Sequence, residues 1–544
     1  MKNFFRKVAF GLGPDEKIPS DPLTWATSQI TDQIPEFSYN GKIYSEKELR
    51  KHYREWVYND RKILRKKFKK DKMGYKAAKN KLRADTGQKF WRNLELAIRQ
   101  KEATKGEYPV LAKLWYFWGN HFTISDKDSL ANYTTGAYQR ESIRANLNKT
   151  FEELAYEATV AWAMIHHLDN GENVGPKSED ARAEWRKRKK RPATINENHA
   201  RELLELHTVS PNAGYTQENI KELALIMTGW APDDSKHKTL LETADVKFQR
   251  KYHQPGKKIF WGKEFPKSKK GLPAAIKFLV NHPSCREFIA YKLCRYLITD
   301  YPTKEMTDPI VKAWEKSGGY LPEVHKAAIE VTFKFNDMHN KFQNPENWWL
   351  QMSRMTDAKW PPGEEKFDNF ILGYGLDPYQ AKPHRFMKDM GHHPYKSKQP
   401  NGYSDISEDW MSPELVIRRL LYARQGYINL KPDNKNNEFY DIPILEGDVF
   451  LLPPHIRHSP QRPQEGSIGL VIEPSRPKGL LDALEWYCFE CKSLVHRAEV
   501  DLVSIVDDFP PIYKKFYESI NLRTCNECGS IHPGKEPPED WVKI

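Results

Sequence analysis

The pattern of hydrophobic and polar positions divides the chain into two parts. Residues 1–425 predict mainly helices, although helical spacing holds only loosely in places. From Gly426 onward, short apolar or alternating runs rich in β-branched residues are separated by Gly, Pro and Asn, as in FYDIPI, DVFLLPP and SIGLVIEP. Such runs predict short strands joined by turns, and their spacing favours a small barrel or sandwich. We therefore expect a multidomain protein with a mainly α-helical domain (1–425) and an all-β domain (426–544).

Charge and cysteine content change at the same place. The 544 residues carry a net charge of +13, but residues 426–544 hold 13 Lys and Arg against 19 Asp and Glu, a net of −6. The rest of the chain is therefore at +19. Four of the six cysteines lie in the last 57 residues. A domain usually holds about 100–200 residues, so a chain of this length is expected to contain more than one. The differences in charge and cysteine content favour two separate units.

Two basic stretches stand out in the first part. Glu46–Arg83 mixes apolar and aromatic residues with many Lys and Arg, and Arg186–Arg191 reads RKRKKR. We interpret the first as a solvated helix pair with one buried stripe, and the second as an exposed loop. The sequence contains no recognisable nucleic-acid-binding module, so no nucleic-acid partner is expected.

The sequence also bears on membranes and localisation. No run approaches the roughly 18 apolar residues of a membrane span, so no membrane partner is expected. The first residues, MKNFFRKVAFGLG, form a poor signal peptide, which favours a cytoplasmic location.

The segment NENHARELLELH contains a possible metal site. His199, Glu202 and Glu205 recur at three-residue steps, which places them on one face of a helix. They could bind a metal or form a buried polar network between helices. The second interpretation is favoured, because HxxE lacks the spacing of a known metal-binding helix.

Residues 1–424 resemble a large bacterial helical family known only as domain of unknown function 1800. The segments that carry the resemblance are WYFWGNHFTIS, RESIRANLNKTFEELAYEATVAWAMIHHLDN, NENHARELLELHT, GYTQENIKELALIMTGW, YHQPGKKIFWG, HPSCREFIAYKLCRYLI and MSPELVIRRLLYAR. The resemblance implies a mostly helical fold and no particular chemistry.

The segment LLPPHIRHSPQRPQ is a candidate iron and substrate site. A predicted strand leads into a proline-rich turn that presents His455, Arg457, His458 and Arg462, and Glu473 lies on the next predicted strand. Two-His-one-carboxylate sets hold Fe(II) in non-haem oxygenases. An arginine can bind a substrate carboxylate through two hydrogen bonds.

The four C-terminal cysteines form the strongest local motif. Cys488-x2-Cys491 and Cys525-x2-Cys528 are separated by 33 residues. Two C-x2-C loops can close a tetrahedral S4 site for zinc or a single iron. A pair of disulfides is the alternative, which a reducing cytosol disfavours.

Residues from about 428 to 534 closely resemble the bacterial 3-hydroxyanthranilate 3,4-dioxygenase family. The shared text includes FYDIPILEGDVFLLPPHIRHSPQRP, GLVIE, RPKGLLDALEWYC and CKSLVHR. The resemblance implies a cupin, here a partial double-stranded β-helix barrel, with mononuclear Fe(II). The implied activity is ring opening of 3-hydroxyanthranilate with O2 to 2-amino-3-carboxymuconate semialdehyde. That product cyclises to quinolinate on the kynurenine route from tryptophan to NAD.

The resemblance also assigns roles to residues. His458 matches the last of three iron ligands, Arg462 the clamp for the substrate carboxylate, and Glu473 the residue near the substrate hydroxyl and amino groups. The cysteines match a second, rubredoxin-like site for iron or zinc away from the chemistry, formed by Cys488, Cys491, Cys525 and Cys528.

The sequence departs from that family upstream of Gly426. The family's other two iron ligands, a His and a Glu six residues later, have no counterpart. His392 and His393 are followed six residues on by Lys398 and Gln399. A fusion of a helical protein with the C-terminal two-thirds of a dioxygenase is the simplest account. The alternatives are a non-enzymatic helical binding or scaffold protein with a cupin remnant, and a dioxygenase completed by a partner chain. A homodimer is also compatible with the sequence.

Overall fold

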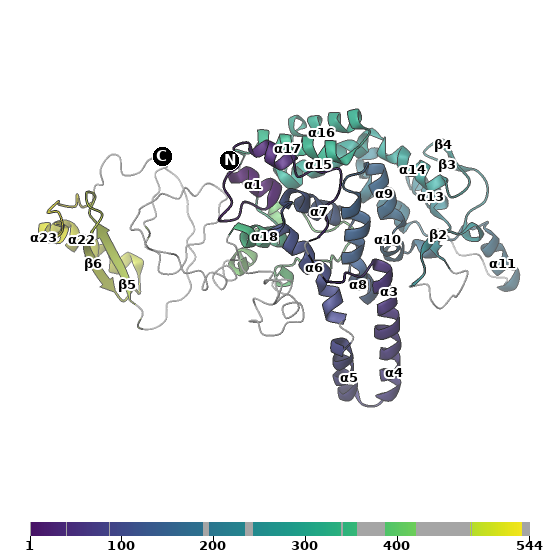
Figure 1. The fold of residues 1–544 in the computed structure, drawn as a ribbon, viewed down its shortest axis with the longest axis horizontal. Helices are drawn as coiled ribbons and strands as arrows, with labels where there is room; N and C mark the ends of the chain where they lie inside the picture. The colour runs from purple at the N-terminus through teal and green to yellow at the C-terminus, as the bar shows by residue number, and fades with distance from the viewer. Residues whose placement is uncertain are drawn as a thin grey trace. The chain divides into compact units, whose positions relative to one another are not determined.

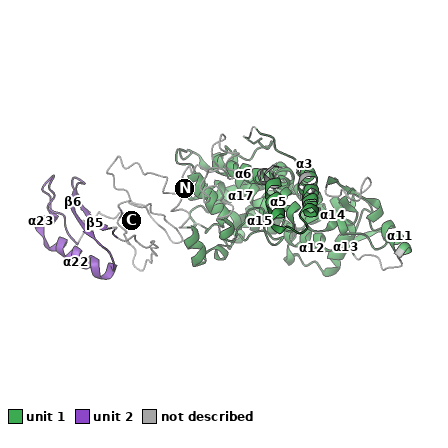
Figure 2. Ribbon diagram, turned by 90° about the horizontal axis from the view of Figure 1, so that it is seen from below, with its two compact units in different colours: residues 1–426, 445–449 green, residues 427–444, 450–544 purple. Residues whose placement is uncertain are grey.

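The computed structural model describes residues 2–37, 39, 41–85, 88–188, 195–233, 243–338, 341–355, 387–419, 458, 479 and 481–535. The chain forms two compact units (Figure 2). Unit 1 comprises residues 1–426 with 445–449, and unit 2 comprises residues 427–444 with 450–544. The predicted boundary at residues 425/426 lies outside the described residues and stays a prediction.

Unit 1 is mainly helical, as predicted. Its N-terminal elements are α1 (Lys2–Ala9), α2 (Pro22–Thr27), α3 (Glu46–His52), the π-helix η1 (Tyr53–Asn59), α4 (Asp60–Lys67), α5 (Lys72–Asp85), α6 (Gln88–Lys105), α7 (Pro109–His121), α8 (Ser129–Tyr138), η2 (Gln139–Ile143) and η3 (Arg144–Asn146). The predicted helix pair in 46–83 is present: α3, η1 and α4 follow one another directly along the chain, and α5 runs back beside α4 (Figure 1).

Further helices complete unit 1. They are α9 (Phe151–Val160), α10 (Trp162–His167), η4 (Asn170–Glu172), α11 (Glu179–Arg188), α12 (Asn198–Glu202), η5 (Leu203–His207), η6 (Pro211–Ala213), α13 (Gln217–Met227), η8 (Arg250–Tyr252), α14 (Gly271–Val280), α15 (Pro283–Leu297), α16 (Lys304–Ser317), α17 (Leu321–Lys334), α18 (Pro345–Met355) and η9 (Ser407–Trp410). The predicted loop at Arg186–Arg191 is corrected in part, because α11 continues through Arg188. The remaining three residues of that run lie outside the described residues.

The core of unit 1 is built around α7. Nearly every residue of this helix is buried, because its sequence PVLAKLWYFWGNH is apolar on all sides. The buried indoles find polar partners: Trp115 Nε1 donates to the Gln139 carbonyl (3.0 Å) and Trp118 Nε1 donates to His325 Nε2 (2.8 Å). These bonds avoid the cost of leaving an indole N–H unpaired in the core.

Two small antiparallel sheets in unit 1 were not predicted. They pair β1 (Trp230–Pro232) with β2 (Val246–Phe248), and β3 (Lys258–Phe260) with β4 (Lys263–Phe265). The two-residue turn between β3 and β4 holds Trp261 and Gly262, both at positive φ (50° and 75°). Positive φ at both central residues is what a tight hairpin turn requires, so Trp261 takes a conformation that is unusual for its residue type.

The described part of unit 2 is a hairpin with two helices. Strand β5 (Asp482–Tyr487) pairs antiparallel with β6 (Leu494–Val500), and α22 (Ile505–Glu518) and α23 (Ile520–Arg523) follow. The strands predicted in FYDIPI, DVFLLPP and SIGLVIEP lie outside the described residues, so the barrel stays a prediction. A search of the described residues for a helix both long and apolar enough to cross a membrane finds none.

Candidate metal centre

Two loops of unit 2 have the same backbone structure. The first contains Cys488 and Cys491 in the turn between β5 and β6, and the second contains Cys525 and Cys528 after α23. In the first loop, the Cys488 N–H donates to the Ser493 carbonyl (2.8 Å) and the Lys492 N–H donates to the Cys488 carbonyl (3.1 Å).

The second loop repeats both hydrogen bonds. The Cys525 N–H donates to the Ser530 carbonyl (2.8 Å) and the Gly529 N–H donates to the Cys525 carbonyl (2.9 Å). Lys492 (φ 64°) and Gly529 (φ 76°) occupy equivalent left-handed positions. The two loops thus present their cysteines in the same way, although glycine takes this conformation more easily than lysine.

The four sulfur atoms converge. All four Sγ atoms lie within 4.8 Å of one another, and the Cys488–Cys528 and Cys491–Cys525 Sγ pairs are each 3.5 Å apart. A tetrahedral ion with metal–sulfur bonds of about 2.3 Å would place the sulfurs about 3.8 Å apart. The donor set therefore fits one zinc or one iron ion. Within the part of the chain that the structure describes, no other group of three or more His, Cys, Asp or Glu residues meets this test.

The electrostatic environment of Cys488 differs from that of Cys491 and Cys528. Hydrogen bonds from the Ser493 hydroxyl and amide lower the pKa of Cys491 to about 6, and Ser530 lowers the pKa of Cys528 in the same way. At Cys488, backbone amides favour the thiolate, but burial and the neighbouring thiols outweigh them and raise its pKa to about 11. Bound metal requires thiolates, and the two serine donors favour that form.

The serines were missed by the sequence interpretation. The signal was present, because the two loops read CFECKS and CNECGS, which share the pattern C-x-E-C-x-S. The repeated serine supplies the hydroxyl beside the second cysteine of each loop.

An aromatic cluster lies beside the sulfur site. Trp486 of β5 stacks on Phe516 of α22 (4.1 Å between ring centroids), and His532 contacts both Phe516 and Phe489 (5.3 and 5.0 Å). These contacts join β5, the turn that follows it, α22 and the segment just after the second loop. The buried residues in the described part of unit 2 are Trp486, Cys488, Phe516 and Cys525. A core this small gives limited hydrophobic stabilisation without a further cross-link.

The predicted iron and substrate site lies almost entirely outside the described residues. His458 is described and is exposed. Arg462, Glu473, His455 and Arg457 lie outside the described residues, so their roles stay predictions.

His392 is held inside unit 1. Its side chain is buried, its Nε2 lies 3.3 Å from Glu346 Oε2, and its ring stacks on Tyr403 (3.9 Å between centroids). Within unit 1, the His392 imidazole therefore already has a carboxylate neighbour and a stacked ring.

The segment NENHARELLELH forms α12 and η5, but its polar residues do not form the expected site. His199 is fully buried, and neither ring nitrogen has a hydrogen-bond partner among the described residues. The pKa of Glu202 is raised, mainly because its carboxyl group is buried and secondly because the negative charge of Glu205 is nearby. His199, Glu202 and Glu205 neither form a metal-holding group nor show the polar network that the sequence favoured.

A buried charge network around a small cavity was not predicted. Arg99 of α6 donates to Gln139 Oε1 (2.7 Å) and Glu346 Oε1 (3.0 Å), and lies between the rings of Tyr116 and Tyr395 (4.0 and 4.4 Å). The cavity that these residues help to line measures about 30 Å³, which suits a water molecule rather than a substrate. We regard this network as structural, because removing either partner of a buried ion pair is costly.

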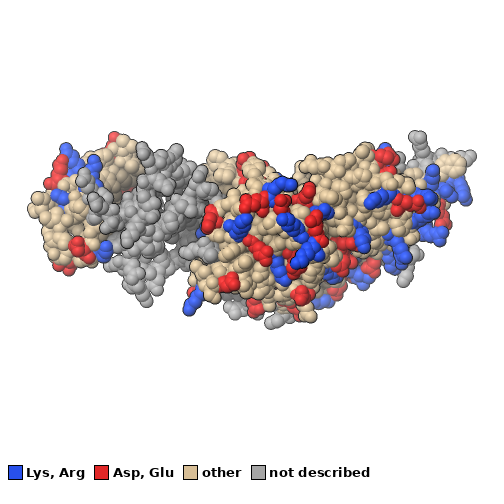
Figure 3. Space-filling view, turned by 90° about the horizontal axis from the view of Figure 1, so that it is seen from above, with Lys and Arg blue, Asp and Glu red and all other residues tan. Residues whose placement is uncertain are grey.

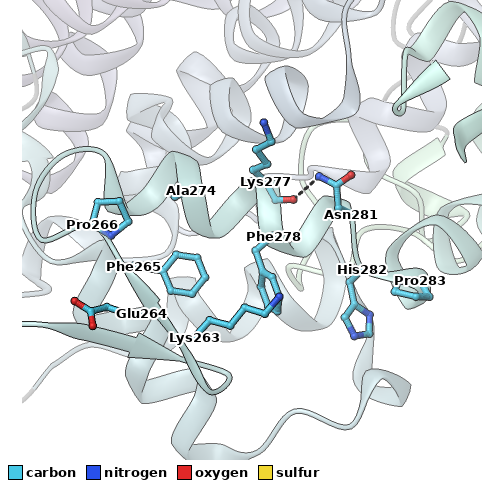
Figure 4. Close-up of a pocket in the computed structure, with 10 residues that line it drawn as sticks. All are labelled: Lys263, Glu264, Phe265, Pro266, Ala274, Lys277, Phe278, Asn281, His282 and Pro283. Atoms are coloured by element: carbon cyan, nitrogen blue, oxygen red, sulfur yellow. Dashed lines mark hydrogen bonds between the residues drawn. The ribbon is translucent and has the colours of Figure 1, made fainter. Parts of the chain in front are cut away.

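A larger groove of about 540 Å³ lies between the β3–β4 hairpin and the junction of α14 with α15 (Figure 4). Its floor includes Phe265 and Phe278, and Lys263 Nζ lies 4.7 Å from the Phe278 ring centroid. One of its polar side chains is used at the end of α14, where Asn281 Nδ2 donates a hydrogen bond to the Lys277 carbonyl (2.7 Å). The groove lacks convergent polar groups that would identify a ligand.

Comparisons with known proteins identify both parts of the chain. Residues 4–502 match the family model described as "Protein of unknown function (DUF1800)". A protein of Brucella anthropi named 3-hydroxyanthranilate 3,4-dioxygenase is 60% identical over 146 residues, covering 27% of this chain and 77% of that protein. A protein of Ruegeria pomeroyi with the same name is 59% identical over 145 residues, again covering 27% of this chain and 77% of that protein. One of Burkholderia cenocepacia is 39% identical over 189 residues, covering 31% of this chain and all of that protein.

The chain therefore belongs to the DUF1800 family, and its C-terminal part belongs to the family of these dioxygenases. The two matches overlap. The dioxygenase match covers more residues than 426–544 contains, so it begins upstream of Gly426, while the DUF1800 match continues to residue 502.

Proposed function

We propose that the C-terminal part acts as a 3-hydroxyanthranilate 3,4-dioxygenase, opening the aromatic ring with O2. The observation that carries the proposal is the 60% identity to the Brucella anthropi protein of that name over 77% of its length. In this proposal Arg462 binds the substrate carboxylate and Glu473 accepts or steers the phenolic proton. His458 would be one ligand of an Fe(II) ion, which would supply the chemistry for O2 to react with the bound substrate.

We also propose that the four cysteines hold one structural iron or zinc ion. The convergence of the four Sγ atoms within 4.8 Å supports this role, as does the repeated hydrogen-bond pattern of the two loops. All four ligand positions are filled by protein thiolates, and closed sites of this kind are structural rather than catalytic.

The second candidate is a non-enzymatic helical protein with a cupin remnant. Two observations favour it: the His458 side chain is exposed, and the His392 imidazole contacts the Glu346 carboxylate within unit 1.

Metal analysis and an activity assay on the whole chain separate the two candidates. The enzyme should contain two metal ions per chain and, with added Fe(II), convert 3-hydroxyanthranilate to the ring-opened product, followed by absorbance. Arg462→Lys should raise KM strongly, because a lysine cannot form the two parallel hydrogen bonds to the carboxylate. Arg457→Lys is the matched control and should retain activity. A result of one thiolate-bound metal ion per chain and no turnover of 3-hydroxyanthranilate would rule out the enzyme and support the non-enzymatic candidate.

A further inference from the structure

A long, strongly charged part of unit 1 is the arm formed by α4, α5 and the turn between them, residues 60–85, here called the basic arm. It contains twelve Lys and Arg residues and three Asp residues. Figure 1 shows it extending away from the rest of unit 1. Solubility is served by surface charges of both signs, so it does not require this concentration of positive charge.

Where burial is described, through residue 82, the basic arm contributes no buried residue to the core. None of the α4 residues is buried, nor is any of residues 72–82. Leu64, Phe68 and Tyr75 are half-buried where the two helices meet. Packing of the unit 1 core therefore does not account for the charge of this segment.

The positive charges point outward along both helices. The exposed basic residues of the arm are Lys62, Arg65, Lys66, Lys67, Lys69, Lys70, Lys72, Lys76 and Lys81. Residues four apart, such as Lys62 and Lys66, lie on one face with a rise of about 6 Å. Asp71 accepts a hydrogen bond from the Gly74 amide (2.8 Å), which gives this carboxylate a local role at the turn.

The rest of unit 1 provides a contrast. Figure 3 shows Lys and Arg interspersed with Asp and Glu on the face seen from above. In α16, Lys304, Lys312 and Lys316 alternate with Glu305, Asp308 and Glu315. The predominance of one charge sign in the arm thus contrasts with the mixed charge of α16.

We propose that the basic arm binds the phosphate backbone of duplex DNA, without reading its sequence. Duplex DNA carries one negative charge per about 1.7 Å of axis, which complements two rigid helices lined with cations. Single-stranded nucleic acid needs exposed aromatic rings for stacking, whereas Phe68 and Tyr75 are half-buried between the helices. A membrane surface needs a continuous apolar face, whereas the exposed apolar residues Ile63 and Met73 stand among charges.

The sequence alone favours a solvated helix pair, because it contains no recognisable DNA-binding module. The structure adds that the two helices project and that nine basic side chains of the arm are exposed, so these charges can reach a partner. Backbone binding needs no base-reading module.

Fluorescence anisotropy with a short mixed-sequence DNA duplex tests the proposal on the whole chain. The triple variant K62Q/K66Q/K70Q removes three exposed charges from the arm and should leave folding unchanged, because none of the three side chains is buried. Its affinity should fall at least about tenfold at low salt. The slope of log affinity against log salt should become shallower by about 3, since each lost phosphate contact removes about 0.9.

The matched control K304Q/K312Q/K316Q removes the same charge from α16 and should bind within twofold of the unaltered chain. Equal losses in both triple variants would show that net charge alone attracts DNA and would overturn the proposal. Undiminished binding by the arm variant would do the same. Preferred binding to single-stranded RNA, or to vesicles containing phosphatidylserine, would assign the arm to a different partner.

Discussion

Buried imidazoles govern the response of unit 1 to acid. Burial lowers the pKa of His199 and His325 to about 3, and that of His167 to about 4. His325 illustrates the cause, because it is fully buried and its Nε2 accepts the Trp118 N–H, which requires a neutral ring nitrogen. An imidazolium at this position would lose that acceptor and carry an unpaired buried charge.

Unit 1 should therefore lose stability as the pH falls below about 6.5. The unfolded chain takes up protons near the ordinary histidine pKa, whereas the folded state resists until about pH 3–4. The stabilisation is complete above pH 6.5 and is lost progressively below it. Each such histidine should contribute on the order of 1–2 kcal/mol of this loss between pH 6.5 and 5. Urea unfolding midpoints at pH 7.5 and 5 measure it.

His325→Gln provides the control, because an amide oxygen can still accept the Trp118 N–H but does not titrate. It should unfold with a shallower pH dependence than the unaltered chain. The same dependence in both would show that His325 does not control the acid response.

At the residue scale, sequence reasoning found the four cysteines and missed their supporting serines. The spacing of the cysteines indicates a shared site, because one metal ion can bind the thiolates of both C-x2-C loops. His199 shows the opposite case. Its spacing to Glu202 and Glu205 suggested a polar cluster, but full burial of the imidazole without a hydrogen-bond partner in the described part of the chain depends on tertiary packing that helical spacing does not specify.

Three helices of unit 1 begin with a reciprocal capping box. The pairs are Ser45 with Glu48 in α3, Thr150 with Glu153 in α9, and Thr216 with Asn219 in α13. In each pair the first side chain accepts the amide three residues on, and the second side chain accepts the amide of the first residue. These bonds satisfy amides that a helix start otherwise leaves unpaired.

Thr150→Ala should destabilise unit 1 by about 1 kcal/mol, because the Glu153 amide (3.3 Å from Thr150 Oγ1) loses its acceptor. Chemical denaturation measures the change. Thr150→Ser is the matched control and should remain within a few tenths of a kcal/mol, since serine keeps the hydroxyl. Equal destabilisation by both substitutions would point to lost packing of the methyl group instead.

At the element scale, helices were predicted more successfully than their ends or the short strands. The helix pair in 46–83 was predicted, while α11 runs through Arg188, three residues into the run assigned to a loop. Strands β1 to β4 have three residues each. A three-residue pairing leaves almost no periodic signal, since the partner strand and not the local sequence stabilises it.

At the scale of the whole molecule, the two units rely on different sources of stability. Unit 1 buries a large cluster of aromatic and aliphatic side chains around α7, whereas the described part of unit 2 buries Trp486, Cys488, Phe516 and Cys525. Two of those four are candidate metal ligands. Unit 2 should therefore depend on the bound ion far more than unit 1 does.

Removing the metal with a chelator should lower the unfolding temperature of unit 2 and leave that of unit 1 unchanged. Cys525→Ser should act in the same way, because three thiolates hold the ion less firmly. Differential scanning calorimetry separates the two transitions. Glu527→Gln changes a spacer residue in the same loop and should leave both transitions in place. An unaltered unit 2 transition after metal removal would contradict a structural ion.

The amino-acid sequence was enough to predict the helical character of the first part and the grouping of the cysteines into one site, both of which the described residues show. These features follow from composition and short spacings, which act locally along the chain. Tertiary structure alone decided which polar groups are buried, as for His199 and the Arg99–Glu346 pair, and which charges are left facing solvent, as in the basic arm. Burial and exposure depend on what packs against a side chain, and those neighbours come from distant segments of the sequence.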